Sequence, residues 1–333
     1  MPSFCRHNRL IHNCPVCARE QNLELRPVVS GGDQTGRTAV SASRPSPRTA
    51  KPPRTRTATA RAASGLRVHR LVRDADDGYR SDLVPGLKSS ADAGRLAGGL
   101  AWAQARLASL ATDPPGLFVV VADPALDIEE RSWLALLISY LGPLNGAAPF
   151  AEIERVRTTW ASGELPSLEG VQVGPRGAHA PQPGLRTLVA YRAWAARSGS
   201  QAAAFTGDPL WTAQRRFSRA FERLALPGLT RGARFELLVA LGQTATFDLR
   251  AATLGLGGSD QVTLAAKRVF GIGDPMLLER RAGALATACG IDLAALDAGL
   301  DNWERETPAQ LGVEPDVEPD PSVLAGVHAA LGL

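Results

Sequence analysis

Apolar residues recur at helical spacing along most of the chain beyond residue 66. Ser89 and Ser90 precede a stripe of leucine and alanine at three- and four-residue steps, which predicts a capped helix over 91–110. Asp127 precedes residues 128–141, which have an acidic first turn and an almost wholly apolar remainder, so a buried central helix is predicted there. The same spacing predicts further helices over 150–160, 187–197, 201–205, 211–224 and 234–241.

Two segments are less regular. Residues 118–121 are short, apolar and β-branched, and their pattern fits either a strand or a buried helical turn. Residues 162–184 are rich in glycine and proline, which predicts a long surface loop. With about ten helices and at most one strand, the body is predicted to be all-α.

Two further helical patterns meet at Gly271-Ile272-Gly273. The first has an apolar stripe that ends at Phe270, and the second begins at once with Met276 and Leu277. The glycines permit close backbone approach, so the hairpin amides and the next helix N-terminus can face a phosphate. This link is typical of a helix-hairpin-helix, and it is equally compatible with a plain turn.

Charge is distributed unevenly along the chain. The net charge of +4 combines +1 over residues 1–33, +10 over residues 34–73 and −7 over residues 74–333, where six acids fall between 304 and 320. Residues 192–234 contain eight arginines against two acids, and four of these, Arg215, Arg216, Arg219 and Arg223, fall on the flanks and exposed side of the predicted helix 211–224. This stretch is a candidate phosphate-binding surface, and the alternative is a merely solvated helix face.

The N-terminal segment has the spacing of a metal site. Cys5-x-His7 and Cys14-x-x-Cys17 supply three thiolates and an imidazole, the set that Zn²⁺ binds tetrahedrally, and His12 is an alternative to His7. Four protein ligands would leave no open position, so a structural zinc ion is expected. The alternative is a set of unpaired thiols.

Composition divides the chain into four parts. A zinc knuckle is predicted over 1–22, a disordered basic linker over 23–65, a helical body over 66–312, and an acidic tail with a short helix over 313–333. The chain has no apolar run of about eighteen residues and no signal-peptide core, so we expect a cytoplasmic protein with no membrane partner.

Several motifs together resemble a known family. They are FCRHNR and NCPVC near the N-terminus, PGLKSS at 85–90, EERSWLALLISYLGPL at 129–144, AFTGD at 204–208, RRFSRAFERLALPG at 215–228, AAKRVFGIGD at 265–274 and LDAGLDNWE at 296–304. The chain resembles the alpha-glutamyl/putrescinyl thymine pyrophosphorylase family, clade 3, of actinobacterial type, over residues 1–20 and 78–312. That resemblance implies a helix-hairpin-helix DNA glycosylase-like fold. It also implies an enzyme acting on hypermodified thymine in DNA, either by exchanging a pyrophosphate for an amine or by cleaving the N-glycosidic bond.

The resemblance also implies roles for individual residues. Glycosylases of this superfamily place a catalytic aspartate after the hairpin, preceded by an apolar residue, at the start of a helix. Asp297 is favoured for its local context, Asp292 fits the distance better and could instead cap a helix, and Glu130 is a further polar candidate. Gly271, Gly273 and Lys267 would contact DNA. Leu277 departs from the family pattern, which commonly has alanine there, and the hairpin lacks a lysine placed as a lyase nucleophile.

Two other functions fit the same residues. The protein could be a non-catalytic zinc-containing DNA-binding adaptor, or an interaction scaffold whose acidic C-terminal segment binds a partner. DNA affinity that falls steeply with salt would separate the two DNA-binding functions from the scaffold. The sequence leaves the oligomeric state open.

Overall fold

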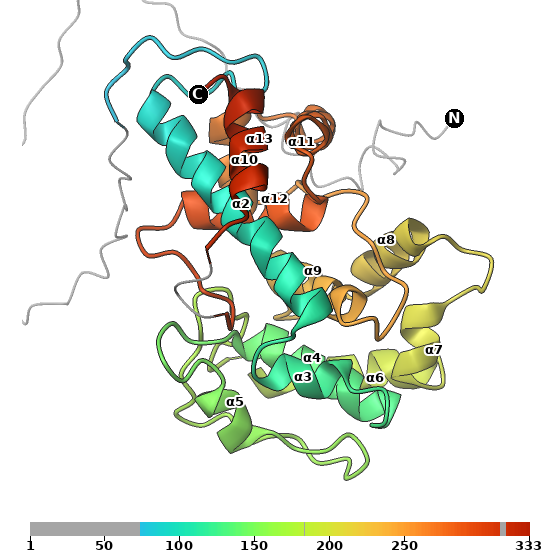
Figure 1. Ribbon diagram of the computed structural model, residues 1–333. Helices are drawn as coiled ribbons and strands as arrows, with labels where there is room; N and C mark the ends of the chain where they lie inside the picture. The colour runs from blue at the N-terminus through green and yellow to red at the C-terminus, as the bar shows by residue number, and fades with distance from the viewer. Residues whose placement is uncertain (1–73, 183, 314–317) are drawn as a thin grey trace, which may run out of the picture. The chain divides into compact units, whose positions relative to one another are not determined.

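The described part of the chain is all-helical, as predicted. A computed structural model describes residues 74–182, 184–313 and 318–333, and within them it contains twelve helices and no strand (Figure 1). The chain divides into a unit of residues 1–66 and one of residues 67–333, and the described residues all belong to the second. The predicted knuckle and linker therefore lie outside the described residues.

Two crossing helices, α2 (Ser90–Thr112) and α12 (Leu293–Trp303), form the centre of one half of the body (Figure 1). The Ser89 hydroxyl caps α2 by accepting from the Asp92 amide, as predicted. The crossing is close because glycines face each other: a Cβ added at Gly99 would lie 3.5 Å from the Gly299 carbonyl oxygen. Three helices pack around this pair: α10 (Gln261–Phe270), α11 (Pro275–Cys289) and α13 (Pro321–Leu331).

The other half is built on α4 (Ile128–Leu141). Eleven of its fourteen residues are buried, and the Asp127 carboxylate caps it by accepting from the amides of Glu129 and Glu130, which confirms the predicted central helix. It packs against α3 (Leu117–Ala122) and α9 (Arg231–Gln243). Residues 118–121 are therefore a helical turn and not a strand.

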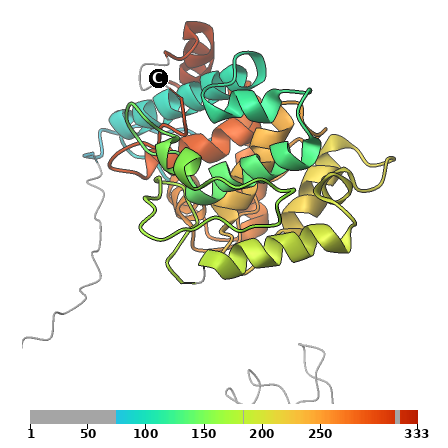
Figure 2. The same cartoon turned by 90° about the horizontal axis from the view of Figure 1, so that it is seen from below.

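Two six-residue helices and two longer helices complete this half. They are α5 (Ala151–Val156), α6 (Gly184–Arg197), α7 (Gln201–Thr206) and α8 (Ala213–Arg223). In the view from below, α6 lies on the side opposite α2 (Figure 2). The helix predicted over 150–160 ends at Val156, because the amides of Trp160 and Ala161 bind the Glu130 carboxylate instead of continuing the helix.

No single described helix is long and apolar enough to cross a membrane. Only the pair α11 and α12, bent by 105° where they meet, passes that test jointly by length and composition.

Candidate functional site

The predicted hairpin lies between α10 and α11. Gly271 ends α10 with a left-handed φ of 65°, and Asp274 caps α11 by accepting from the Leu277 amide at 2.9 Å. Gly86 supports the hairpin from behind: its amide donates to the Val269 carbonyl at 2.9 Å. Both hairpin glycines are exposed, and the space next to Gly273 is open, so a phosphate could approach the backbone there.

The side chains around the hairpin carry unpaired positive charge. Lys267 in α10 reaches only the Gly258 carbonyl, at 3.4 Å, and Arg280 in α11 is exposed. Neither makes an ion pair with any residue that the structure describes. Arg268 is paired with Glu304, and Met276 is 83% exposed. The hairpin therefore combines free backbone amides, two cations and an exposed apolar residue.

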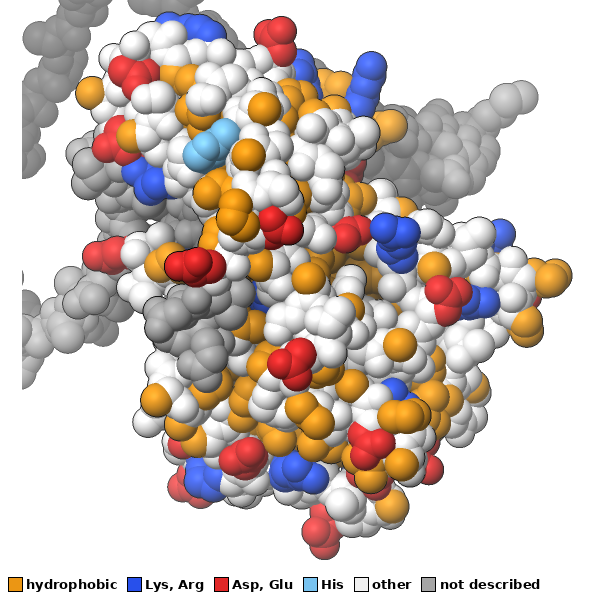
Figure 3. All heavy atoms as spheres, in the orientation of Figure 1, with side chains coloured by type: hydrophobic (Ala, Val, Ile, Leu, Met, Phe, Trp, Pro, Cys, Tyr) orange, Lys and Arg blue, Asp and Glu red, His pale blue; other side chains and the backbone are white. Residues whose placement is uncertain are grey.

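The four arginines of α8 do not form one free basic surface. Arg216 pairs with Asp248 and is 13% exposed, and Arg219 pairs with Glu222 at 2.8 Å. Arg223 reaches the Ser198 hydroxyl at 3.4 Å, and Arg215 lies over the Trp211 ring at 5.3 Å. Figure 3 shows lysine and arginine side chains scattered among acidic ones on this face of the body.

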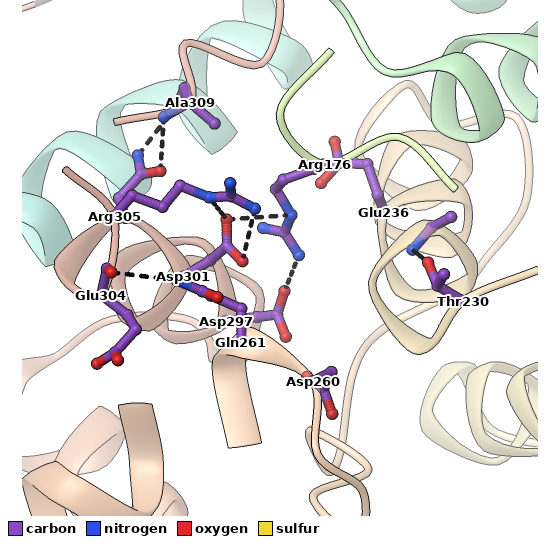
Figure 4. A network of polar contacts seen from close by, with 12 residues as sticks. Arg176, Thr230, Glu236, Asp260, Gln261, Asp297, Asp301, Glu304, Arg305 and Ala309 are labelled. Carbon is purple, nitrogen blue, oxygen red and sulfur yellow. Dashed lines mark hydrogen bonds and ion pairs between the residues drawn. The ribbon is translucent and has the colours of Figure 1, made fainter. Parts of the chain in front are cut away.

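Asp297 lies inside α12 and is buried, with 1% of its surface exposed. Arg176 donates to its Oδ1 at 2.5 Å (Figure 4), and Arg231 donates to its Oδ2 at 2.5 Å. Arg176 comes from the irregular segment 157–182, and Arg231 is the first residue of α9. Asp297 therefore does not start a helix, and both of its oxygens are occupied by guanidinium groups.

The ion pairs continue on both sides of Asp297. Arg231 also binds Asp260, the N-cap of α10, at 2.9 Å, and Asp301 lies 3.7 Å from Arg176 and 2.6 Å from Arg305. Burial alone would lower the pKa of Arg176, but the carboxylates of Asp301 and Asp297 outweigh it and raise that pKa. This buried network joins α9, α10, α12 and segment 157–182.

Glu130 also binds backbone rather than facing a pocket. Its carboxylate accepts from the amides of Trp160 and Ala161, at 2.7 and 2.9 Å. The neighbouring Glu129 accepts from the amides of Gln201 and Ala202, at 2.9 and 2.8 Å, at the start of α7. The acidic first turn of α4 thus holds a loop and a helix in place.

Asp292 lies in a different environment. It is the N-cap residue of α12, its side chain is 35% exposed, and it lines a polar pocket of about 600 Å³. Its Oδ1 accepts from Arg250 at 3.1 Å and its Oδ2 from Gln104 at 3.3 Å. The carboxylate makes no capping hydrogen bond to its own helix, so its oxygens face the pocket and these two side chains.

The pocket brings Asp292 together with the start of the arginine-rich helix. Gln214 from the first turn of α8 and Gln243 from the end of α9 line the same space, and neither carboxamide hydrogen bonds with a described residue. Ala245, also in the lining, has a left-handed φ of 53°, which costs about 1 kcal/mol or more for a residue other than glycine.

Sequence reasoning did not find Arg176, Arg231 or Arg250 as partners of the two aspartates. Arg176 and Arg250 lie in irregular segments, and all three contact carboxylates that are 42 or more residues away along the chain. Only pairwise information from related sequences could have revealed such contacts.

The predicted zinc ligands Cys5, His7, Cys14 and Cys17 lie outside the described residues. Within the described ranges, no group of three or more histidine, cysteine, aspartate or glutamate side chains could hold a metal ion. The chain matches no family model, no curated protein and no solved structure.

Proposed function

We propose that this protein is a DNA base-modifying or base-excising enzyme that acts on hypermodified thymine, with Asp292 as its reacting carboxylate. The placement of Asp292 carries the proposal: it begins the helix that follows the hairpin helices, and it lines a polar pocket beside Arg250. The volume of this pocket, about 600 Å³, is within the range of small-molecule sites. Asp297, buried between two guanidinium groups, is assigned a positioning role.

A carboxylate in this position suits both reactions that the family resemblance implies. In N-glycosidic cleavage, a base taken out of the stack leaves the sugar while the carboxylate stabilises the positive charge that develops on it, and water then adds. In the exchange reaction, the carboxylate accepts a proton from the amine as the new carbon–nitrogen bond forms. Pyrophosphate departs with the electrons of the broken carbon–oxygen bond. Arg250 lies beside Asp292 and is therefore close enough to contact the departing pyrophosphate.

The hairpin is the proposed site of phosphate contact. The fifteen residues of α11 separate the hairpin from Asp292 by about 22 Å along the helix axis. At 3.4 Å per step, this corresponds to about six steps of a DNA strand. A duplex held by the hairpin amides, Lys267 and Arg280 could therefore present a base about half a turn away to the Asp292 pocket.

A structural zinc ion belongs to the same proposal. Cys5, His7 (or His12), Cys14 and Cys17 would supply the tetrahedral ligand set that Zn²⁺ takes in closed sites. The ion would supply folding free energy to a segment too short for an apolar core, and it would take no part in the reaction.

The test uses DNA that contains 5-hydroxymethyluracil or phage-modified thymine, with glutamate or putrescine present, and analyses the nucleosides by mass spectrometry. We expect the wild type to alter or release a base, and Asp292→Asn to lower the rate about 10²–10⁴-fold. Asp248→Asn is the matched control, because Asp248 lines the same pocket but pairs with Arg216 and leaves Asp292 untouched. It should retain most of the activity.

The outcomes separate the three candidate functions. If the wild type alters no base, the enzyme proposal fails. A DNA affinity that falls as salt rises from 50 to 200 mM, by roughly the factor typical of phosphate contacts, would then identify a non-catalytic DNA-binding adaptor. No DNA affinity at low salt would leave the scaffold. If Asp292→Asn is as active as the wild type, the carboxylate has been assigned to the wrong residue.

A further inference from the structure

A second pocket, of about 670 Å³, lies between α2 and the segment 304–310. Its walls are mainly apolar, with Trp102 from α2 and Trp303 from the end of α12 as the largest side chains. Trp102 is half-buried, and its indole N–H makes no hydrogen bond with any residue that the structure describes. No residue of this pocket lines the Asp292 pocket, so the two spaces are separate.

Two glycines of α2 also line this pocket, and only one of them has a packing reason. Gly99 faces Gly299 at the crossing with α12. A Cβ at Gly98 would meet no heavy atom within 4 Å, although glycine inside a helix costs about 0.5–1 kcal/mol relative to alanine. The absence of a side chain at Gly98 lets the pocket reach the α2 backbone.

The two arginines that line the pocket are already paired, and Glu306 is a lining carboxylate that makes no ion pair with a described residue. Arg95 contacts both Asp74 and Asp92 at 2.5 Å, and Arg305 contacts Asp301 at 2.6 Å. The side-chain amide of Asn302 is occupied by the backbone of Ala309. An anionic ligand would therefore find no unpaired cation among the lining residues, whereas a flat apolar ring would find the half-buried Trp102 indole beside the largely buried Trp303 ring.

We propose that the pocket between α2 and segment 304–310 binds a neutral planar heteroaromatic ring of nucleobase or nucleoside size, beside Trp102 and Trp303 and over Gly98. The inference does not depend on the chemistry assigned to Asp292. Indole faces pack favourably against such rings in offset or edge-on arrangements. Thr307 and the Trp102 N–H give the rim polar groups that can meet ring nitrogen and oxygen atoms.

The experiment is isothermal titration of the full chain with adenosine, thymidine and their 5′-monophosphates. Gly98→Leu fills the pocket from the helix backbone, where the structure leaves room for a side chain. Gly94→Leu is the matched control: it also lies in α2 with open space around it, and it does not line the pocket. Helical side chains lean toward the N-terminus, so a leucine at 94 points away from residue 98.

We expect saturable binding of at least one nucleoside, a loss of about tenfold or more in Gly98→Leu, and unchanged affinity in Gly94→Leu. Thermal unfolding followed by circular dichroism should show both variants at least as stable as the wild type, because leucine is a better helix former than glycine. Absence of nucleoside binding, equal binding by both variants, or tighter binding of the monophosphates would each overturn the proposal. If Gly98→Leu does not fold, Trp102→Leu replaces it, with the same expected loss.

Discussion

Replacing Asp297 with asparagine tests whether this carboxylate supports the fold or performs the chemistry. The substitution leaves the buried guanidiniums of Arg176 and Arg231 facing a neutral amide, with 4% and 7% of their side-chain surfaces exposed. Removing one partner of a buried ion pair costs about 3–5 kcal/mol. In a body of this size, each kcal/mol shifts the melting temperature by about 2–4 °C. We therefore expect a fall of about 6–20 °C.

The assay is thermal and urea unfolding followed by circular dichroism, with Asp292→Asn as the matched control. Asp292 pairs with an Arg250 side chain that is 67% exposed, and such exposed pairs contribute about 0–1 kcal/mol. The control should therefore melt within about 4 °C of the wild type. If Asp297→Asn melts like the wild type yet loses base-altering activity, Asp297 is the reacting carboxylate and its positioning role is refuted.

Three further predictions concern other parts of the molecule. Burial would raise the pKa of Asp260, but the Arg231 guanidinium and Thr263 hold it below its usual value. The charged Asp260 side chain therefore stabilises the fold above the unfolded pKa of about 3.9, and this stabilisation is lost as the pH falls through the lower folded pKa. Asp260→Asn should flatten the loss of urea resistance below about pH 4, and parallel curves of urea resistance against pH for the variant and the wild type would contradict this. Burial raises the pKa of Cys289 to about 11, so this thiol should be alkylated only in denaturant. Alkylation of the native protein, read by intact mass, should label no cysteine with zinc bound and the three N-terminal cysteines after chelation. In Gly86→Ala, the Cβ would lie 1.8 Å from the Arg268 carbonyl, so urea unfolding should show a loss of about 1–3 kcal/mol, whereas Gly94→Ala, with open space, should show none.

The helices could be predicted from the sequence because helix formation depends on residues that are close together along the chain. The caps at Ser89 and Asp127 and the apolar run of α4 are all encoded within a few positions, and the structure confirms them. Residues 118–121 were ambiguous because four apolar residues cannot distinguish a period of 2 from one of 3.6. Their helical form follows from packing against α4, which no local pattern contains.

The charge pattern was a poorer guide because counting along the chain ignores distant partners. Of the eight arginines between 192 and 234, Arg216 pairs with Asp248, and Arg231 pairs with Asp260 and Asp297. Arg192 stacks on Trp133 and Trp160 instead of facing solvent. A local excess of positive charge thus includes arginines that stabilise the fold and are not available to a phosphate.

The two aspartates of α12 have different roles because of where the helix places them. They lie five positions apart, which puts their side chains about 140° apart around the axis. Asp297 points into the buried network, so Asp292 points elsewhere, and only one of them can face the pocket. The network also binds Asp260, the N-cap of the helix that leads to the hairpin. Asp297 therefore links the proposed phosphate contact to the helix that bears Asp292, so its replacement should disturb their relative placement as well as stability.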